Sequence, residues 1–468
     1  MKPWIWIAVA AVPLWAASQS QTPSTSGPVL SIDDAIAIAE QNAFSLKTAA
    51  SGVEQAHQGV NAAKAAFGPQ ISAVANYTHI LDHTNFGSAP ATTGGATTGA
   101  TTGSTSGASS LLSSVSLVDS QSATLSVTLP IDISGNIRRG VRAAQASYNQ
   151  SRANFAAADN DLRLSVRQSY FQILQDKAQI SVAEESVNNA QQTLTNAQQK
   201  LAAGALARYD VLQYETQLSQ AQSDLITAQN NLAVARENFN DILARPIDTP
   251  FDVAEVTNMP QVSDTPDSLI QTAEHNRPDI LAAIANIESL KFQREATEAG
   301  MDPSLALGAA HARYYGPGTL NTEFYETQAF LNLTIPIWDS GVTRAKVKEA
   351  RQLEVQAQIA LEKLKLSVAL EVQQDLSNLT SAASKLVVAQ KQVDQAAETY
   401  RLAVVRANAG EGITLDVTNA QAQLTTARTG LVNARYGYLS AYAALQRAIN
   451  QDGGKVPPIV APVQGKKL

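Results

Sequence analysis

The sequence predicts an α+β membrane protein in which a unit of two β-strands and long coiled-coil helices occurs twice. Two observations carry this prediction. The chain repeats itself at an offset of 206 residues, without a gap from Leu129, which matches Ile335, through about Phe239. Apolar residues also follow a strict helical period in most of each copy, and a period of two in four short segments.

Composition excludes several classes of protein. The net charge of −7 and the lack of a dense Lys or Arg run argue against a nucleic-acid surface. The chain has no cysteine, which excludes disulfides, thiolate metal sites and a lipid-modified cysteine. The close pair His79 and His83 has no carboxylate at ligand spacing, and no phosphate-binding loop or nucleophile motif occurs. We therefore expect neither an enzyme nor a cofactor or metal site.

The first 20 residues are expected to be a signal peptide. Lys2 precedes an apolar core from Trp4 to Trp15, and small residues follow at Ala16 to Ser18. A short membrane anchor is the alternative, but the apolar run is shorter than a helix that spans a bilayer. The sequence therefore predicts an exported chain.

The repeats divide the chain. "LPIDISGNIRRGV" recurs as "IPIWDSGVTRAKV", and "AGALARYDVLQYETQLSQAQ" recurs as "AGEGITLDVTNAQAQLTTAR". A third pair, "FGPQISAVANY" and "MDPSLALGAAH", has an offset of 234, so the first copy holds 234 − 206 = 28 more residues, visible as a Gly/Thr/Ser tract. The predicted divisions are a first repeat at 29–250, a linker at 251–264, a second repeat at 265–450 and a tail at 451–468.

Apolar stripes predict coiled-coil helices in both copies. From Leu379 to Ala407, and again from Val417 to Ala448, stripe positions alternate spacings of three and four. A sustained seven-residue repeat predicts left-handed supercoiling, whereas a generic amphipathic bundle loses register within about three heptads. The predicted helices, one long and two short in each copy, cover 31–66, 136–203, 209–244, 265–300, 341–409 and 415–450.

Four segments with a period of two predict strands at 71–81, 121–133, 305–315 and 327–338, with a low-complexity loop at 82–120. Each is about ten residues long, the length that a tilted strand needs to cross a bilayer. Half-buried strands of a soluble sheet are the alternative for any single segment. The surrounding exported coiled coils favour the membrane, as do aromatic residues near the strand ends at Tyr77, Tyr314, Tyr315, Phe330 and Trp338.

Prolines and glycines mark the predicted junctions. Pro69, Pro130, Pro303 and Pro336 stand where helices and strands meet, because proline turns the chain without the loss of a mid-strand hydrogen bond. "NAGEGITLDV", residues 408–417, interrupts the helical stripe and matches residues 202–211 of the first copy. Both segments are predicted turns between antiparallel helices, and Gly410 and Gly412 supply backbone freedom in the second.

Taken together, the duplicated junctions and the duplicated "AG" turns followed by "DV" resemble those of the TolC-type outer-membrane efflux channel family, over essentially the whole mature chain. The resemblance implies a homotrimer with a 12-stranded β-barrel in the outer membrane and an α-helical periplasmic tunnel. It also implies a passive conduit for an inner-membrane transporter and its periplasmic adaptor, in efflux or type I secretion. The loop 82–120 is then extracellular, and the linker 251–264 and the tail form a belt around the tunnel.

The resemblance also implies functional residues. The prolines mark the barrel-to-tunnel junction. Asp416 matches an inward-facing aspartate at the pore constriction, and the family's second aspartate aligns with Asn419, a departure that halves the ring charge. The latch Arg and Tyr of the family align with Gly412 and Ala407, so that latch is absent here. The periplasmic tips that contact the adaptor comprise Gly204, Ala205, Leu206, Asp210, Gly410, Gly412 and Ile413.

Alternatives remain open for the acids and for the function. Asp210 matches the acidic partner of the missing latch, but both Asp210 and Asp416 also fit a helix N-terminus, where a carboxylate stabilises the macrodipole. A periplasmic coiled-coil scaffold or adaptor without a pore would share the heptads. Such a protein would lack two duplicated pairs of strands of membrane-spanning length.

Overall fold

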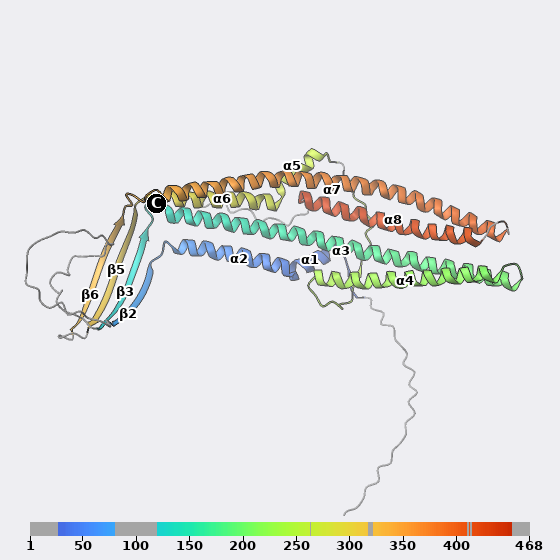
Figure 1. Ribbon diagram of the computed structural model, residues 1–468, viewed down its shortest axis with the longest axis horizontal. Coiled ribbons are helices and arrows are strands. Elements are labelled where there is room, and N and C mark those ends of the chain that lie inside the picture. The colour runs from blue at the N-terminus through green and yellow to red at the C-terminus, as the bar shows by residue number, and fades with distance from the viewer. Residues whose placement is uncertain are drawn as a thin grey trace, which may run out of the picture. The chain divides into compact units, whose positions relative to one another are not determined.

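Figure 1 shows the computed structural model, which describes residues 27–79, 119–262, 264–316, 322–409, 411 and 414–451. The predicted signal peptide, nearly all of the predicted loop and the tail beyond Gln451 lie outside these residues. Gly410, Gly412 and Ile413 lie outside them as well.

The elements of the two copies follow the same order. The first copy has β1 (Val29–Leu30), α1 (Ile32–Asn42), α2 (Phe44–Ala65), β2 (Gln70–His79), β3 (Asp119–Ile131), α3 (Asn136–Ala202) and α4 (Arg208–Ile242). A short strand, β4 (Asp252–Val253), lies in the linker. The second copy has α5 (Pro266–Asn276), α6 (Pro278–Glu298), β5 (Ser304–Gly316), β6 (Thr322–Thr334), α7 (Val342–Asn408) and α8 (Thr414–Ile449).

Four helices lie where the heptads predict coiled-coil helices. α3 and α7 have 67 residues each, which corresponds to about 100 Å at 1.5 Å per residue. α4 and α8 have 35 and 36 residues. None of the described helices is long and apolar enough to cross a bilayer.

The two short helices that precede the strands are broken, so the prediction of single helices at 31–66 and 265–300 is wrong. In the second copy Arg277 is extended (φ −67°, ψ 126°), because Pro278 disfavours helical geometry in the residue before it. In the first copy Ala43 adopts a similar geometry (φ −54°, ψ 129°). The two breaks are equivalent, since 43 + 234 = 277.

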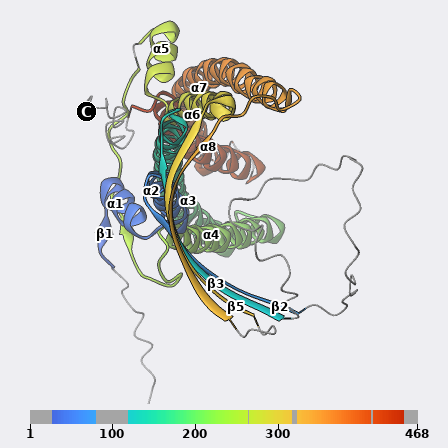
Figure 2. The ribbon, with the colours of Figure 1, turned by 90° about the vertical axis from the view of Figure 1, so that its left-hand side faces the viewer.

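The sheet has the antiparallel order β2-β3-β5-β6, and its strands curve together (Figure 2). The register places Leu129 opposite Leu307, and Leu307 opposite Leu331, so one face of the sheet is apolar. The other face is polar, with Ser72 and Ser126 hydrogen-bonded through their hydroxyls at 2.8 Å.

The fourth strand, β6, begins and ends earlier than the predicted 327–338. Pro336 cannot donate to a ladder, and Asp339 instead accepts hydrogen bonds from the N–H groups of Gly341 (2.9 Å) and Thr343 (2.6 Å) at the start of α7. The alternating pattern therefore continues past the strand end, and Ile337 is 89% exposed.

The junction prolines take two kinds of position. Pro69 and Pro303 directly precede β2 and β5. Pro130 lies inside β3, one residue before its end and opposite Ala306. Pro336 follows β6 by two residues.

The aromatic residues expected near the strand ends do not share one face. Tyr77 and Tyr315 both lie opposite Gln121 on the apolar face. Phe330 lies on the polar face opposite Gly308, where an added Cβ would stand 2.3 Å from the Phe330 ring. The Phe330 ring thus fills the space that a side chain at Gly308 would need.

The described residues form two compact units, each with segments from both copies. Among the described residues, and apart from the gaps given above, the first unit draws on 27–43, 165–261 and 382–440, and the second on 44–164, 262–381 and 441–451. The sheet belongs to the second unit. The two units thus do not coincide with the two sequence repeats.

The first unit has an aromatic core around Tyr170, which is fully buried and packs against Phe239. The Tyr170 hydroxyl lies 2.9 Å from the carbonyl oxygen of Leu30 and 2.8 Å from that of Ala254. Burial raises the pKa of this phenol to about 12, so it remains a donor at physiological pH. Tyr170 therefore ties the parallel pair β1 and β4 to α3.

Candidate functional site

The turn between α3 and α4 closes with a left-handed glycine. Gly204 has φ +73°, and its N–H donates to the Leu201 carbonyl at 2.9 Å, while the Ala205 N–H donates to the Lys200 carbonyl at 2.8 Å. This is the Schellman pattern of a helix C-terminus. At the end of α7 the equivalent outer bond runs from the Glu411 N–H to the Arg406 carbonyl at 3.0 Å. The two turns thus begin at matching positions of the two copies.

The first tip exposes small and apolar side chains. Ala205 is exposed, whereas Leu206 packs against the buried cluster of Leu194, Ala197, Val211 and Tyr214. Tyr209 is 69% exposed. The tip is therefore anchored by the cluster and offers an aromatic ring to its surroundings.

The three candidate polar residues lie near the starts of helices, Asp210 and Asp416 in the first turn and Asn419 in the second. Asp210 is half-buried in the first turn of α4, and its charge adds to the burial that raises the pKa of Tyr214. Asp416 and Asn419 lie one helical turn apart in α8 and are both exposed, while Val417 between them is buried. Residues three apart share a helix face, so Asp416 and Asn419 face the same side of α8.

One polar contact between the two helical hairpins was not predicted. The Lys200 ammonium lies 3.2 Å from the Ala407 carbonyl oxygen and 3.3 Å from Asn408 Oδ1. The sequence does carry a signal for it, because a basic residue in the last turn of a helix commonly binds terminal carbonyl groups. That the acceptor is a carbonyl group of α7, rather than of α3 itself, could be seen only in the folded structure.

The outer edges of the sheet are open. β2 and β6 are the edge strands, and each pairs with one strand only among the described residues. Apolar side chains near these edges are exposed, with Ile71 at 69% and Leu331 at 64%. A sheet of this kind has unpaired backbone groups on two sides and one uncovered apolar face.

A family comparison decides the class of the protein. Residues 35–245 and 269–451 match the family model described as outer membrane efflux protein. The chain belongs to this family. This efflux protein is therefore a protein of the outer membrane, as the sequence predicts, and no comparison supports the scaffold or adaptor without a pore.

Individual relatives agree with the family match. This efflux protein is 24% identical over 347 residues to nodulation protein T of Rhizobium leguminosarum bv. viciae, a match that covers 73% of this chain and 71% of the relative. It is 23% identical over 321 residues to the outer membrane protein TolC of Vibrio cholerae, covering 65% and 71%. The solved CmeC outer membrane channel of Campylobacter jejuni superposes with a TM-score of 0.72 at 17% identity, covering 96% of this chain and 94% of CmeC. At that identity the superposition shows the fold alone.

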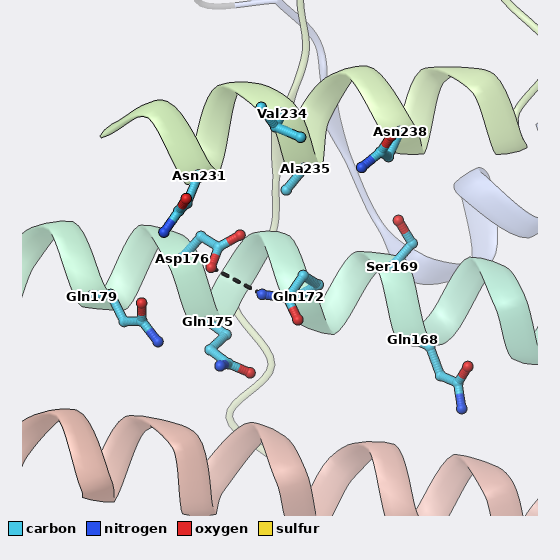
Figure 3. A pocket seen from close by; sticks show the side chains of 10 residues that line it. All are labelled: Gln168, Ser169, Gln172, Gln175, Asp176, Gln179, Asn231, Val234, Ala235 and Asn238. Carbon is cyan, nitrogen blue, oxygen red and sulfur yellow. Dashed lines mark hydrogen bonds between the residues drawn. The ribbon is translucent and has the colours of Figure 1, made fainter. Parts of the chain in front are cut away.

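A polar groove runs between α3 and α4 of this efflux protein (Figure 3). Glutamines at one-turn intervals on α3 line it together with Asn231 and Asn238 of α4. Asp176 is the acidic residue of the groove, is only 5% exposed and accepts a hydrogen bond from Gln172 at 2.9 Å. Burial outweighs this hydrogen bond and raises the pKa of Asp176. The groove is therefore rich in amide side chains and contains one buried carboxyl group whose raised pKa favours the neutral form.

Proposed function

We propose that this efflux protein is a homotrimeric channel-tunnel that passively conducts substrates across the periplasm and the outer membrane. The observation that carries the proposal is the four-stranded sheet with two open edges. In lipid every backbone polar group must be paired, so a sheet can span a membrane only as a closed barrel. Four strands from each of three chains would close a 12-stranded barrel.

The remaining elements fit this assembly. The apolar sheet face suits lipid and the polar face suits a water-filled lumen. The junction prolines Pro69, Pro130, Pro303 and Pro336 then mark the passage from barrel to tunnel, and the long heptad helices α3 and α7 line the tunnel with α4 and α8. We assign residues 1–20 to a signal peptide, 82–120 to an extracellular loop, and 251–264 with 451–468 to a belt around the tunnel.

A passive conduit does not itself drive transport, so the proposed channel needs partner proteins that do. An inner-membrane transporter supplies the energy and selects the cargo, and its periplasmic adaptor binds the turn tips. The adaptor contact comprises Gly204, Ala205, Leu206, Asp210, Gly410, Gly412 and Ile413. The exposed first tip, with Tyr209 beside it, supports this assignment.

Asp416 is the proposed pore constriction, with Asn419 on the same face of α8. In a threefold assembly three Asp416 carboxylates would converge, and such a ring favours cations. The exposure of both side chains in the single chain supports a position on the tunnel lining.

Extraction and conductance test the channel. The protein should be extracted by detergent from outer-membrane fractions with the mass of three chains, and it should form conducting pores in planar lipid bilayers. Recovery as a soluble periplasmic monomer without conductance would contradict the proposal and favour a scaffold or adaptor.

A further inference from the structure

The contact of Lys200 joins the end of α3 to the end of α7. Its ammonium lies 3.2 Å from the Ala407 carbonyl oxygen, which is among the last carbonyl groups of α7. The C-terminal end of a helix carries partial negative charge, so a cation is stabilised there. Within the first unit this contact holds the first hairpin, α3 and α4, to the second hairpin, α7 and α8.

The duplication places an equivalent cation in the second copy. Since 200 + 206 = 406, Lys200 matches Arg406, and both are the basic residue in the last turn of a 67-residue helix. The acceptors Ala407 and Asn408 match Leu201 and Ala202 at the end of α3. Arg406 and Ala202 are both exposed. Each chain therefore has a second exposed cation, Arg406, and a second exposed helix end, the C-terminus of α3, that could form the same kind of contact.

A second contact between the hairpins repeats in the same way. Gln217 of α4 donates to Gln421 of α8 at 3.1 Å. The offset converts this pair into Gln423 and Glu215, which are both exposed. An amide donor thus again has an acceptor at the matching position.

A third contact gives the same result. Arg428 of α8 forms an ion pair with Glu185 of α3. The offset converts this pair into Gln222 and Lys391, both exposed, and the lysine can donate to the glutamine carbonyl. By contrast, the hydrogen bond between Tyr214 and Thr414 has no counterpart, because the matching residues are Ala420 and Arg208.

We propose that Arg406 binds the C-terminal end of α3 in a neighbouring subunit, so that six basic residues encircle the periplasmic mouth. This inference rests on the homotrimer of the proposed function. Repeated head-to-tail contacts close into a ring, in which Lys200 makes the bond within each chain and Arg406 makes the bond between chains. These bonds hold the mouth closed in place of the latch that Gly412 and Ala407 cannot form.

Cross-linking tests the geometry in a chain that has no natural cysteine. The pair Arg406→Cys with Ala202→Cys, treated with a short bis-maleimide, should give covalent dimers and trimers on a denaturing gel. The matched pair Lys200→Cys with Asn408→Cys should cross-link within one chain, without an increase in mass. Arg406→Cys alone should remain monomeric on the gel.

The outcomes separate this inference from the proposed function. If the native mass is that of a trimer and bilayer conductance persists, but the Arg406→Cys and Ala202→Cys pair stays within one chain or does not react, the inference is overturned and the channel stands. If the protein is a non-conducting monomer, both fail.

Conductance tests the closing role. Arg406→Gln should raise the open fraction of single channels by roughly tenfold, because three helix-end contacts are lost at once. Arg401→Gln is the matched control, since Arg401 pairs with Glu398 of its own helix at 2.7 Å. An Arg406→Gln channel that opens no more often than the Arg401→Gln channel would contradict the role of Arg406 in closure.

Discussion

At the scale of single residues, the Arg277 side chain shows how one buried cation can connect several helices. It is 6% exposed and lies at the break between α5 and α6. Its guanidinium donates to Asp279 at 2.8 Å, to Glu371 of α7 at 2.5 Å and to the Ala448 carbonyl of α8 at 3.3 Å. All these groups belong to the second unit, so one buried cation links three helices there.

Arg277→Met should lower the free energy of unfolding by about 1.5–3 kcal/mol, because the half-buried Asp279 loses its ion-pair partner, whereas Glu371 keeps Arg447. The exposed pair of Arg401 and Glu398 provides the control, and Arg401→Met should leave the melting temperature nearly unchanged. Thermal unfolding in detergent, followed by circular dichroism, compares the two variants. Equal melting temperatures would contradict the structural role of Arg277.

The acid of the polar groove allows a prediction with the opposite sign. Since burial raises the pKa of Asp176, ionisation of this carboxyl at neutral pH opposes folding. Asp176→Asn should therefore raise the melting temperature at pH 7, and the gain should shrink as the pH falls through the folded-state pKa. A gain that stays constant down to pH 3 would exclude ionisation as its cause.

The proposed constriction can be tested both by removing a carboxylate and by adding one. Asp416→Asn should reduce cation selectivity and block by multivalent cations in planar bilayers, because three like charges disappear from the ring. Asn419→Asp adds a carboxylate one turn away on the same face and should increase both. Unchanged selectivity in the two variants would place these residues outside the constriction.

At the scale of elements, the long helices were predictable because a seven-residue repeat is a property of sequence alone. Their breaks and ends were less so. Pro278 was visible as a helix boundary, but nothing at Ala43 itself signals the matching break in the first copy. The offset of 234 would have transferred the break from one copy to the other. The true end of β6 depends on Pro336 and the Asp339 cap rather than on the alternating pattern.

The turn between α3 and α4 gives a prediction about backbone conformation. Gly204→Ala should destabilise the protein by about 1–2 kcal/mol, because an alanine is strained at φ +73°. Gly59→Ala is the matched control in the middle of α2, where an added Cβ meets no atom within 4 Å. That change should stabilise by up to about 1 kcal/mol through helix propensity. Melting temperatures that move in the same direction would contradict this account of the turn.

At the scale of the whole molecule, the two units share a sensitivity to acid. In the first unit burial alone would raise the pKa of Asp252, but hydrogen bonds from Lys177 and the Val253 N–H lower it overall. In the second unit burial likewise opposes ionisation of Asp279, and Arg277 outweighs it and lowers the pKa. Each unit therefore has a carboxylate that is stabilised by a cation in the folded state.

Both units should lose stability in acid. Because the folded-state pKa values of Asp252 and Asp279 lie below the ordinary value of 3.8, their contribution is complete above that pH and disappears as the pH falls through the folded values. Melting temperature should drop below about pH 4. The variant Asp252→Asn should be less stable at pH 7 and show a shallower drop. A drop of the same steepness in that variant would exclude Asp252 from the effect.

The candidate site was predictable only in part. Its location at two duplicated turns followed from the repeat, and the identities of Asp416 and Asn419 followed from the family resemblance. Lys200 was missed because a lysine in a last helical turn has many acceptors within reach, and only the folded chain selects Ala407. The proposed contacts between chains could not be predicted from the sequence. They were inferred by shifting the contacts within one chain by 206 residues, and those contacts are known only from the folded structure.

The pairing of β1 with β4 has a consequence for how the molecule could have arisen. Leu30 lies opposite Val253, so the beginning of the first repeat meets the linker that directly follows it, and the Tyr170 hydroxyl holds both strands to one point of α3. A segment whose ends are adjacent can be copied in tandem or permuted without threading of the chain. The first repeat is in this sense a topologically closed module.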